Sequence, residues 1–162
     1  MLSKGITRRL ALLGLIAGLA GCGFTPVYGP GGVATAWQNA ITVEAPDTVL
    51  GFRMAGRLSD VFGDPTRAGY VLGVTPQLAP VPATITVDGD ITRFNVTGNA
   101  AWTLQDSTGA TVTEGFVQTF TSYSATGSTV ATQAAEADAQ NRLAIALADL
   151  IVQQLLTQGV TP

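Results

Sequence analysis

Thr92-Arg-Phe-Asn-Val-Thr-Gly-Asn-Ala-Ala-Trp-Thr-Leu104 is the stretch from which the fold follows most directly. Apolar and polar side chains alternate in it over about thirteen residues, which is the spacing of a β-strand with one face in a core. The stretch therefore predicts a long strand with one buried side. Its apolar face carries Phe94, Val96, Ala100, Trp102 and Leu104, and its polar face carries Arg93, Asn95, Thr97, Asn99 and Thr103.

Turn-forming residues flank this strand on both sides. Asp88-Gly89-Asp90 precedes it and Asp106-Ser107-Thr108-Gly109 follows it, and both segments are typical of tight connections between antiparallel strands. The run 70–75 before the first turn is strand-like, and the run 111–123 after the second is rich in Thr, Val, Phe and Tyr. The centre of the sequence therefore predicts three consecutive antiparallel strands.

The first of these strands contains a proline-rich interruption. Three prolines lie between Pro76 and Pro82, and strand-like residues resume at 84–87. Because proline cannot donate a hydrogen bond to a neighbouring strand, we expect these prolines at an edge, in a bulge or in a loop.

The last of these strands carries large side chains on both faces. Phe116 and Phe120 share one face, and Val117 and Tyr123 lie on the other. Since leaving either set in water is unfavourable, we expect both faces of this strand to be covered.

The remaining segments complete the predicted order of elements. Residues 41–45 alternate and predict a short first strand. Apolar residues then recur at helical spacing from a cap at 47 or 48 to Gly63, and again from a cap at 128 or 132 to about Thr157. The order is β-α-β-β-β-α. We therefore predict an α+β fold, with two helices packed on one face of a small antiparallel or mixed four-stranded sheet.

The amino-terminal end has the organisation of a secretion signal. Three basic residues precede an apolar run of about ten residues, half the length needed to cross a membrane. The run ends in Leu19-Ala20-Gly21-Cys22, which resembles the lipobox of bacterial lipoproteins, where cleavage precedes an acylated cysteine. An ordinary secretory signal is the alternative, but it leaves the only cysteine unexplained. We expect residues 1–21 to be a signal peptide, Cys22 to be lipidated, residues 22–40 to be an extension and residues 41–162 to form one domain.

The composition beyond residue 21 excludes several classes of function. The chain contains no histidine, and its only cysteine is the predicted lipidation site, so the commonest general base, metal ligand and nucleophile are missing. Five arginines stand against eleven acidic residues, which disfavours binding to nucleic acid. We therefore expect a binding or scaffolding protein with no catalytic residues, metal site or cofactor. An enzyme would need an acid–base pair among Asp88, Asp90 and Glu114.

Two further stretches allow two interpretations each. Arg53 and Arg57 lie one helical turn apart, so they could bind an anion together or belong to a solvated helix face. Residues 23–40 could be a flexible tether between lipid and domain. Four large apolar side chains in that segment are costly to leave in water, however, so we expect it to pack along its own domain or a partner.

The opening of the predicted mature chain, Cys22-Gly23-Phe24-Thr25-Pro26-Val27-Tyr28-Gly29, resembles the start of the LptE family of lipopolysaccharide-assembly lipoproteins. That family commonly begins Cys-Gly-Phe-x-Pro-Leu/Val-Tyr, and its order of elements and alanine-rich last helix are also similar. The resemblance implies an outer-membrane lipoprotein that sits inside the LptD β-barrel as plug and assembly partner during lipopolysaccharide transport. Gly23 after the cysteine agrees with outer-membrane sorting of Gram-negative lipoproteins.

The resemblance also suggests site residues. Phe24, Pro26 and Tyr28 are then expected at the interface with the barrel. Lipopolysaccharide contacts in the family involve basic residues, and here Arg93 on the polar strand face is the first candidate and Arg67 the second. An ordinary salt bridge is the alternative for each arginine. The other function left open is a generic outer-membrane lipoprotein that binds a lipid or peptidoglycan, which a deep apolar pocket would favour.

Overall fold

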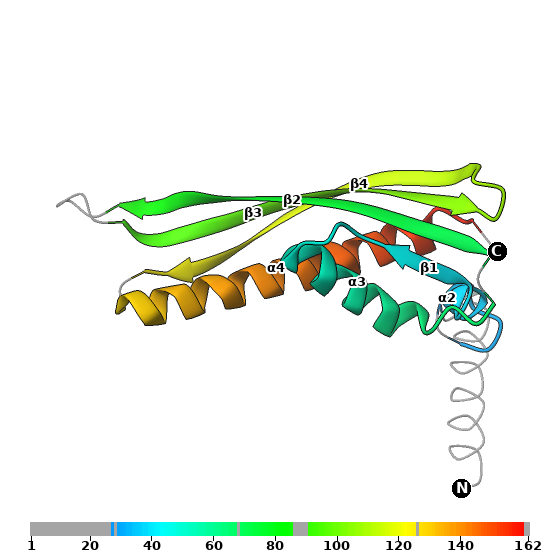
Figure 1. The fold of residues 1–162 in the computed structure, drawn as a ribbon, viewed down its shortest axis with the longest axis horizontal. Coiled ribbons are helices and arrows are strands. Elements are labelled where there is room, and N and C mark those ends of the chain that lie inside the picture. The colour runs from blue at the N-terminus through cyan, green and yellow to red at the C-terminus, as the bar shows by residue number, and fades with distance from the viewer. Residues whose placement is uncertain (1–26, 28, 68, 86–90, 126, 161–162) are drawn as a thin grey trace, which may run out of the picture.

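The described part of the chain is an open four-stranded sheet with three helices, which confirms the predicted α+β class. The computed structural model describes residues 27, 29–67, 69–85, 91–125 and 127–160. The predicted order of elements is found, and one short helix precedes it (Figure 1). The elements are helix α2 (Val33–Trp37), strand β1 (Ile41–Glu44), helix α3 (Val49–Phe62), strand β2 (Tyr70–Ile85), strand β3 (Ile91–Asp106), strand β4 (Thr111–Ser124) and helix α4 (Thr129–Thr157).

The sheet is mixed, and its strands lie in the order β1-β2-β3-β4. β2, β3 and β4 form the predicted antiparallel meander, in which Trp102 of β3 stands opposite Val74 of β2 and Gly115 of β4. β1 is parallel to β2, with Ile41 opposite Tyr70, and α3 provides the crossover that a parallel pair requires. The predicted turn residues 88–90 lie outside the described residues.

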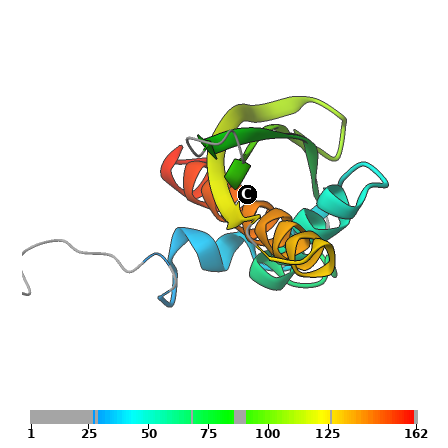
Figure 2. The same cartoon turned by 90° about the vertical axis from the view of Figure 1, so that its left-hand side faces the viewer.

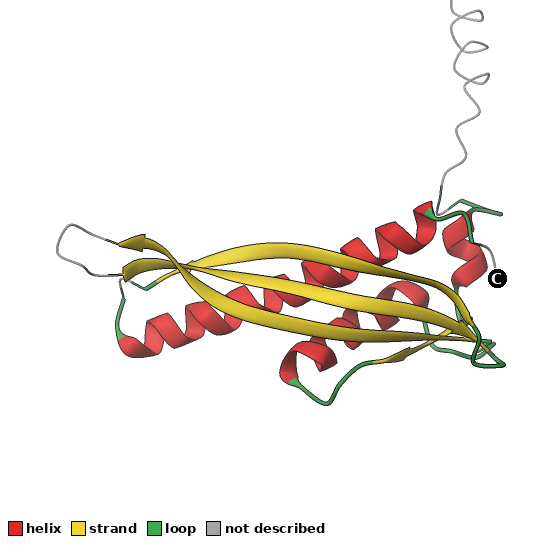
Figure 3. Cartoon of the chain, turned by 90° about the horizontal axis from the view of Figure 1, so that it is seen from above, coloured by secondary structure: helices red, strands yellow, loops and turns green. Residues whose placement is uncertain are grey.

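Helices α3 and α4 lie side by side on one face of the sheet (Figure 1). Viewed along the long axis, the long strands curve over α4 (Figure 2). The apolar face predicted for β3 is the buried one, since Val96, Trp102 and Leu104 belong to the same core cluster as Leu143 and Leu147 of α4. Seen from above, the opposite face of the sheet has no described helix over it (Figure 3).

Local signals set the ends of the helices. Thr48, one of the two predicted caps of α3, accepts a hydrogen bond from the backbone N–H of Gly51 at 3.0 Å through its Oγ1. Gly63 ends α3 with a φ of 76°, a conformation that glycine adopts without strain. Ser128 caps α4, because its Oγ accepts from the N–H of Ala131 at 3.3 Å.

The turn between β3 and β4 is the one predicted from Asp106 to Gly109. The carboxylate of Asp106 accepts from the hydroxyl of Thr108 at 2.6 Å and from the backbone N–H of Thr108 at 2.8 Å. These hydrogen bonds, the first of them above all, lower the pKa of Asp106 from its ordinary value. The turn therefore fixes the register in which β4 returns along β3.

The prolines do not interrupt β2, so that expectation was wrong. The strand is continuous, and Pro76 and Pro80 both stand opposite residues of β3. β1 pairs with β2 only as far as Gly73, and beyond that point no described strand pairs with the far side of β2. Pro76, Pro80 and Pro82 are an even number of residues apart, so their nitrogen atoms face the same side. Since proline has no N–H for β3, that side is the open edge, as one of the predicted alternatives had it.

Helix α2 is the element that the sequence did not predict. Trp37 at its end is fully buried, and its ring meets that of Tyr70 edge to face, with centroids 5.1 Å apart and planes at 77°. This part of the extension 22–40 therefore packs on the domain. The predicted lipidation site, Cys22, and the predicted interface residues Phe24, Pro26 and Tyr28 lie outside the described residues.

Strand β4 is covered on one face only, contrary to expectation. Val117 and Tyr123 point inward and are buried, whereas Phe116 and Phe120 point outward and are 56% and 64% exposed. The helices pack against a single face of the sheet, so no described element reaches these two rings.

Candidate functional site

The candidate site is the outer face of the sheet, which we define as the described side chains of β2, β3 and β4 that point away from α3 and α4. They alternate with buried residues along each strand, as the pleat requires, and none of them is buried. They are Val71, Thr75, Gln77, Ala79 and Val81 on β2, Arg93, Asn95, Thr97, Asn99, Ala101, Thr103 and Gln105 on β3, and Glu114, Phe116, Gln118, Phe120, Ser122 and Ser124 on β4.

The outer face is neutral along most of its length. Arg93 and Glu114 are its only charged members, and they lie ten positions apart in the sheet register, or about 33 Å at the usual rise per residue. Between them are amides and hydroxyls with the exposed rings of Phe116 and Phe120. Such a surface can form neutral hydrogen bonds and bury two aromatic side chains, which is the composition of a protein interface more than of a catalytic centre.

The two rings stand clear of their neighbours because of the register. Phe116 is opposite Ala101 and Phe120 is opposite Thr97, so each ring lies beside a small side chain. Their spacing in the sequence predicts that the two rings share one face, but the expectation that this face is covered was wrong. Counting the register from the turn at Asp106 would have placed them beside the polar face of β3.

The outer edge of β4 is closed by side chains of α4. The amide Nε2 of Gln154 donates to the carbonyl of Phe116 at 3.1 Å, and the guanidinium of Arg142 donates to the carbonyl of Ser122 at 3.1 Å. With prolines along the open edge of β2, both long edges of the sheet are thus protected against a further strand. A partner therefore has the outer face to contact and no long edge to extend.

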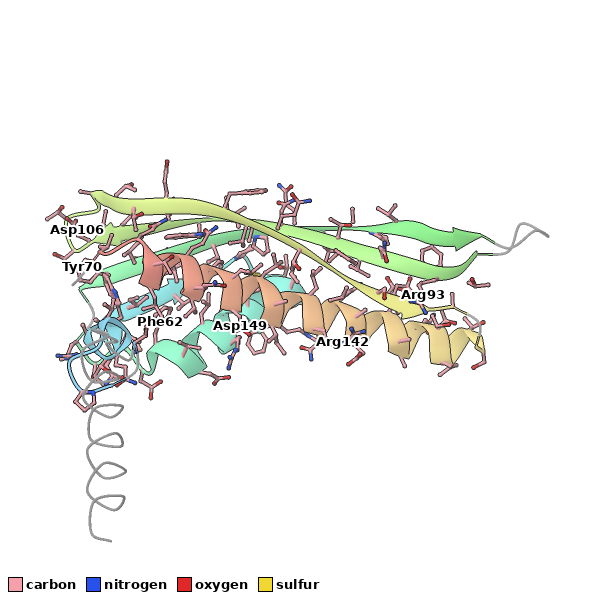
Figure 4. All side chains as sticks on the ribbon, turned by 180° about the vertical axis from the view of Figure 1, so that it is seen from behind. Phe62, Tyr70, Arg93, Asp106, Arg142 and Asp149 are labelled. Carbon is pink, nitrogen blue, oxygen red and sulfur yellow. The ribbon has the colours of Figure 1, made fainter. Side chains whose placement is uncertain are left out.

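Arg93, the first candidate for anion binding, lies at the end of the outer face that leads to the β2–β3 connection (Figure 4). It is exposed and stands opposite Thr84 of β2 and Ser124 of β4. Within the described residues it forms no ion pair, so the salt-bridge alternative finds no support there.

Arg67, the second candidate, is exposed and lies in the loop before β2. Its guanidinium donates to the carbonyl of Gln38 at 2.9 Å, and its backbone N–H donates to the carbonyl of Asn39 at 2.8 Å. It therefore ties this loop to the end of α2. Arg67 and Arg93 lie near opposite ends of β2, about 50 Å apart along a strand of this length, so they do not form one site.

Arg53 and Arg57 do share a surface hollow of about 360 Å³ between α3 and α4. Asp60 also lines this hollow, and Arg57 forms an ion pair with Asp149 of α4, with Nε and Oδ1 2.8 Å apart. The charge of Arg57 is thus matched by a carboxylate, and this ion pair joins the two helices. The geometry favours the structural interpretation of the pair over an anion site.

The acids required by the enzyme alternative do not meet in the described structure. Glu114 is exposed on the outer face, and Asp88 and Asp90 lie outside the described residues. Among the residues described, no group of three or more acidic, histidine or cysteine side chains is placed to hold a metal ion. Within the same residues, no helix combines the length and apolar character that crossing a bilayer requires.

Comparison with known proteins identifies the family. Residues 38–155 match the LptE family, whose description is lipopolysaccharide-assembly, and this match covers more than half of the chain. Among curated proteins, none matches the sequence.

Solved structures share the fold. A candidate lipoprotein of Caulobacter crescentus CB15 superimposes with a TM-score of 0.66 at 24% identity, covering 80% of this chain and 97% of that one. Rare lipoprotein B of Shewanella oneidensis superimposes with a TM-score of 0.57 at 13% identity, covering 74% of this chain and 93% of that one. The minor lipoprotein of Acinetobacter baumannii gives 0.56 at 18% identity, with 74% and 92% covered. At these identities the likeness shows a common architecture. With the sequence match over most of the domain, it leads to one conclusion: the chain belongs to the LptE family of lipopolysaccharide-assembly proteins.

Proposed function

We propose that this protein is an outer-membrane lipoprotein, anchored through acylated Cys22, that fills the lumen of an LptD-type β-barrel. There it acts as plug and assembly partner while lipopolysaccharide is transported to the outer leaflet. The observation that carries the proposal, beside the family match, is the bare outer face with its neutral polar groups and two exposed phenylalanines. The lumen of a wide membrane barrel is polar, so its wall suits such a face.

The dimensions of the domain support this placement. Strand β3 has 16 residues and therefore spans about 50 Å, more than the hydrocarbon thickness of about 30 Å. The sheet is thus long enough to line a barrel through its full height. Because both long edges are protected, the contacts would come from side chains of the outer face and not from a shared sheet.

Three further assignments belong to the proposal. Phe24, Pro26 and Tyr28 would lie at the boundary with the barrel, and Arg93 would contact a phosphate or core sugar of lipopolysaccharide. Arg67 remains the weaker candidate, because its guanidinium already serves the carbonyl of Gln38. Arg93 is exposed at one end of the outer face, which fits a residue that contacts lipopolysaccharide during transport.

The alternative is a generic lipoprotein that binds a lipid or peptidoglycan. Its best support is an apolar groove of about 370 Å³ between α3 and α4. This groove is open at the surface of the domain, whereas a lipid carrier would be expected to enclose most of its ligand.

Affinity isolation of the tagged full chain from its own membranes in mild detergent separates the two functions. We expect a large outer-membrane β-barrel to co-elute in stoichiometric amount, as mass spectrometry would show. If the protein elutes alone, or with peptidoglycan or a small ligand, the barrel partnership is wrong and the generic function replaces it.

A further inference from the structure

The groove between the carboxyl-terminal halves of α3 and α4 has a volume of about 370 Å³ and a mostly apolar lining. We call it the α3–α4 groove. Val61 of α3 and Val152 and Leu156 of α4 supply its apolar wall. Two residues at its border, Arg57 and Asp149, neutralise each other through the 2.8 Å ion pair. The groove can therefore accommodate an uncharged apolar group. A charged ligand would find its possible partners, Arg57 and Asp149, already paired with each other.

One residue of the amino-terminal segment belongs to the lining of the α3–α4 groove. Val27 lines the groove, and its carbonyl accepts a hydrogen bond from the backbone N–H of Ala34 in α2 at 3.1 Å. The backbone at residue 27 is thus fixed beside the groove. The three residues before it can move at most about 11 Å from this point, since an extended chain advances 3.3–3.6 Å per residue.

We propose that the segment Phe24–Pro26 lies in the α3–α4 groove, with the ring of Phe24 against Val61, Val152 and Leu156. The segment is uncharged and too short to reach beyond the groove. Its phenylalanine is a large apolar side chain, which suits a groove lined by valine and leucine. Pro26 has no N–H, so an apolar wall leaves no donor of that residue unsatisfied.

This docking fixes how the lipid anchor leaves the domain. Cys22 is five residues before Val27, so its acyl chains begin within about 18 Å of the groove. The end of the domain that carries α2 is then held at the membrane, and the opposite ends of β2 and β3, at 85 and 91, lie away from it. This consequence rests on the lipidation in the proposed function, whereas the docking itself does not. The outer side of the docked segment remains free to meet the barrel.

Photo-crosslinking of the full, membrane-anchored chain tests the docking. Phe24→p-benzoylphenylalanine keeps the aromatic ring and reacts with the C–H groups that surround it. Cleavage after arginine gives peptides 58–67, which holds Val61, and 143–162, which holds Val152 and Leu156. We expect irradiation to join the peptide that contains position 24 to these two. The matched control is Phe52→p-benzoylphenylalanine, because Phe52 also lies on α3 but is 79% exposed.

The outcomes distinguish this inference from the proposed function. The docking is supported if position 24 gives several-fold more crosslinked product with peptides 58–67 and 143–162 than position 52 does. This holds whether or not a barrel co-purifies. Products from position 24 that contain only another protein, only lipid or a second copy of the chain overturn it, even where the barrel does co-purify. Equal yields from the two positions also overturn it.

Discussion

At the scale of single residues, Gly115 sets how closely β4 lies over the core. A Cβ at this position would lie 2.7 Å from three atoms of the Trp102 indole. That ring is 1% exposed, and its Nε1 donates to Oε1 of Gln154 at 3.0 Å, so it is held in place and cannot move aside cheaply. The absence of a side chain at residue 115 is therefore a packing requirement.

We expect Gly115→Ala to lower the free energy of unfolding by about 1–3 kcal/mol, the usual cost of overpacking a core. The matched control is Gly56→Ala, on the exposed side of α3, where a Cβ would meet nothing within 4 Å. That change should stabilise by about 0.5–1 kcal/mol, because alanine favours a helix over glycine. Denaturant unfolding of both variants measures the difference. Equal effects at the two positions would show that Trp102 yields easily.

Tyr123 is the residue through which high pH should act on the fold. Burial, and secondarily the negative charge of Glu136, raises the pKa of its phenol above the ordinary value of 10.0. Its ring stacks on that of Phe94 with centroids 5.4 Å apart. Because the raised pKa belongs to the folded state, the stabilisation is complete below the unfolded pKa of about 10 and is lost as pH rises through the folded value.

We therefore expect the free energy of unfolding to fall as pH rises above about 10. Tyr123→Phe should reduce that fall and should change the free energy of unfolding little at neutral pH. Glu136→Gln should move the phenol back towards its ordinary pKa, because the neighbouring charge is removed. Ultraviolet titration of the phenolate, together with denaturant unfolding at several pH values, measures both effects. A Tyr123→Phe variant with the full alkaline loss of stability would assign that loss to other groups.

At the scale of elements, the prolines of β2 act on its open edge. Their nitrogen atoms face outward where β1 no longer pairs, so this edge lacks donors at regular positions. An exposed long edge with all its donors would be a template for pairing with another chain. We infer that the prolines hinder edge-to-edge pairing between copies of the domain.

The double substitution Pro76→Thr, Pro80→Thr should restore two outward N–H groups without removing any backbone hydrogen bond to β3. We expect the variant to self-associate at concentrations where the parent is monomeric, as sedimentation or light scattering would show. Pro65→Thr in the exposed loop after α3 is the control. A monomeric double variant would mean that the twist of the sheet protects the edge by itself.

The sequence predicted most of these elements because their signals are local. Alternation in 92–104 identified the buried face of β3, and cap residues at Thr48 and Gly63 bounded α3. What it missed depends on distant contacts. Five residues cannot show a helical period, and α2 is secured by the packing of Trp37 on Tyr70.

The prolines and the outer rings were misjudged for the same reason. Whether a proline breaks a strand depends on whether that strand has a neighbour on its second side, and β1 is too short to provide one. Whether Phe116 and Phe120 are covered depends on where the helices pack. The candidate site itself could be predicted only as polar positions on β3, since its aromatic half lies on a strand whose register is set by the turn at Asp106.

At the scale of the whole molecule, the outer face is the surface that the proposed barrel partner would cover. Phe116 and Phe120 are its largest exposed apolar groups, and aromatic side chains commonly dominate the energy of an interface. They contribute little to the core of the domain itself, so they can be changed without unfolding it.

We expect Phe116→Asn, Phe120→Asn to lower recovery of the barrel in the affinity isolation by at least about tenfold, since losing one hot-spot aromatic commonly costs 2 kcal/mol or more. Its circular dichroism and unfolding midpoint should match those of the parent chain. Phe52→Asn, at an exposed position on α3 and not on the sheet, is the control. Undiminished recovery from the double variant would place the barrel contact elsewhere.

The protected edges also bear on the time between synthesis and assembly. A sheet with two reactive edges has to meet its partner quickly, because every encounter with another copy risks aggregation. The edge of β2 carries prolines, and the edge of β4 is bridged by side chains of α4. The folded domain can therefore remain unassembled for longer without pairing with another copy. If the proposed barrel partnership holds, the domain can therefore be made before the barrel is ready, and the component made more slowly would set the number of complexes.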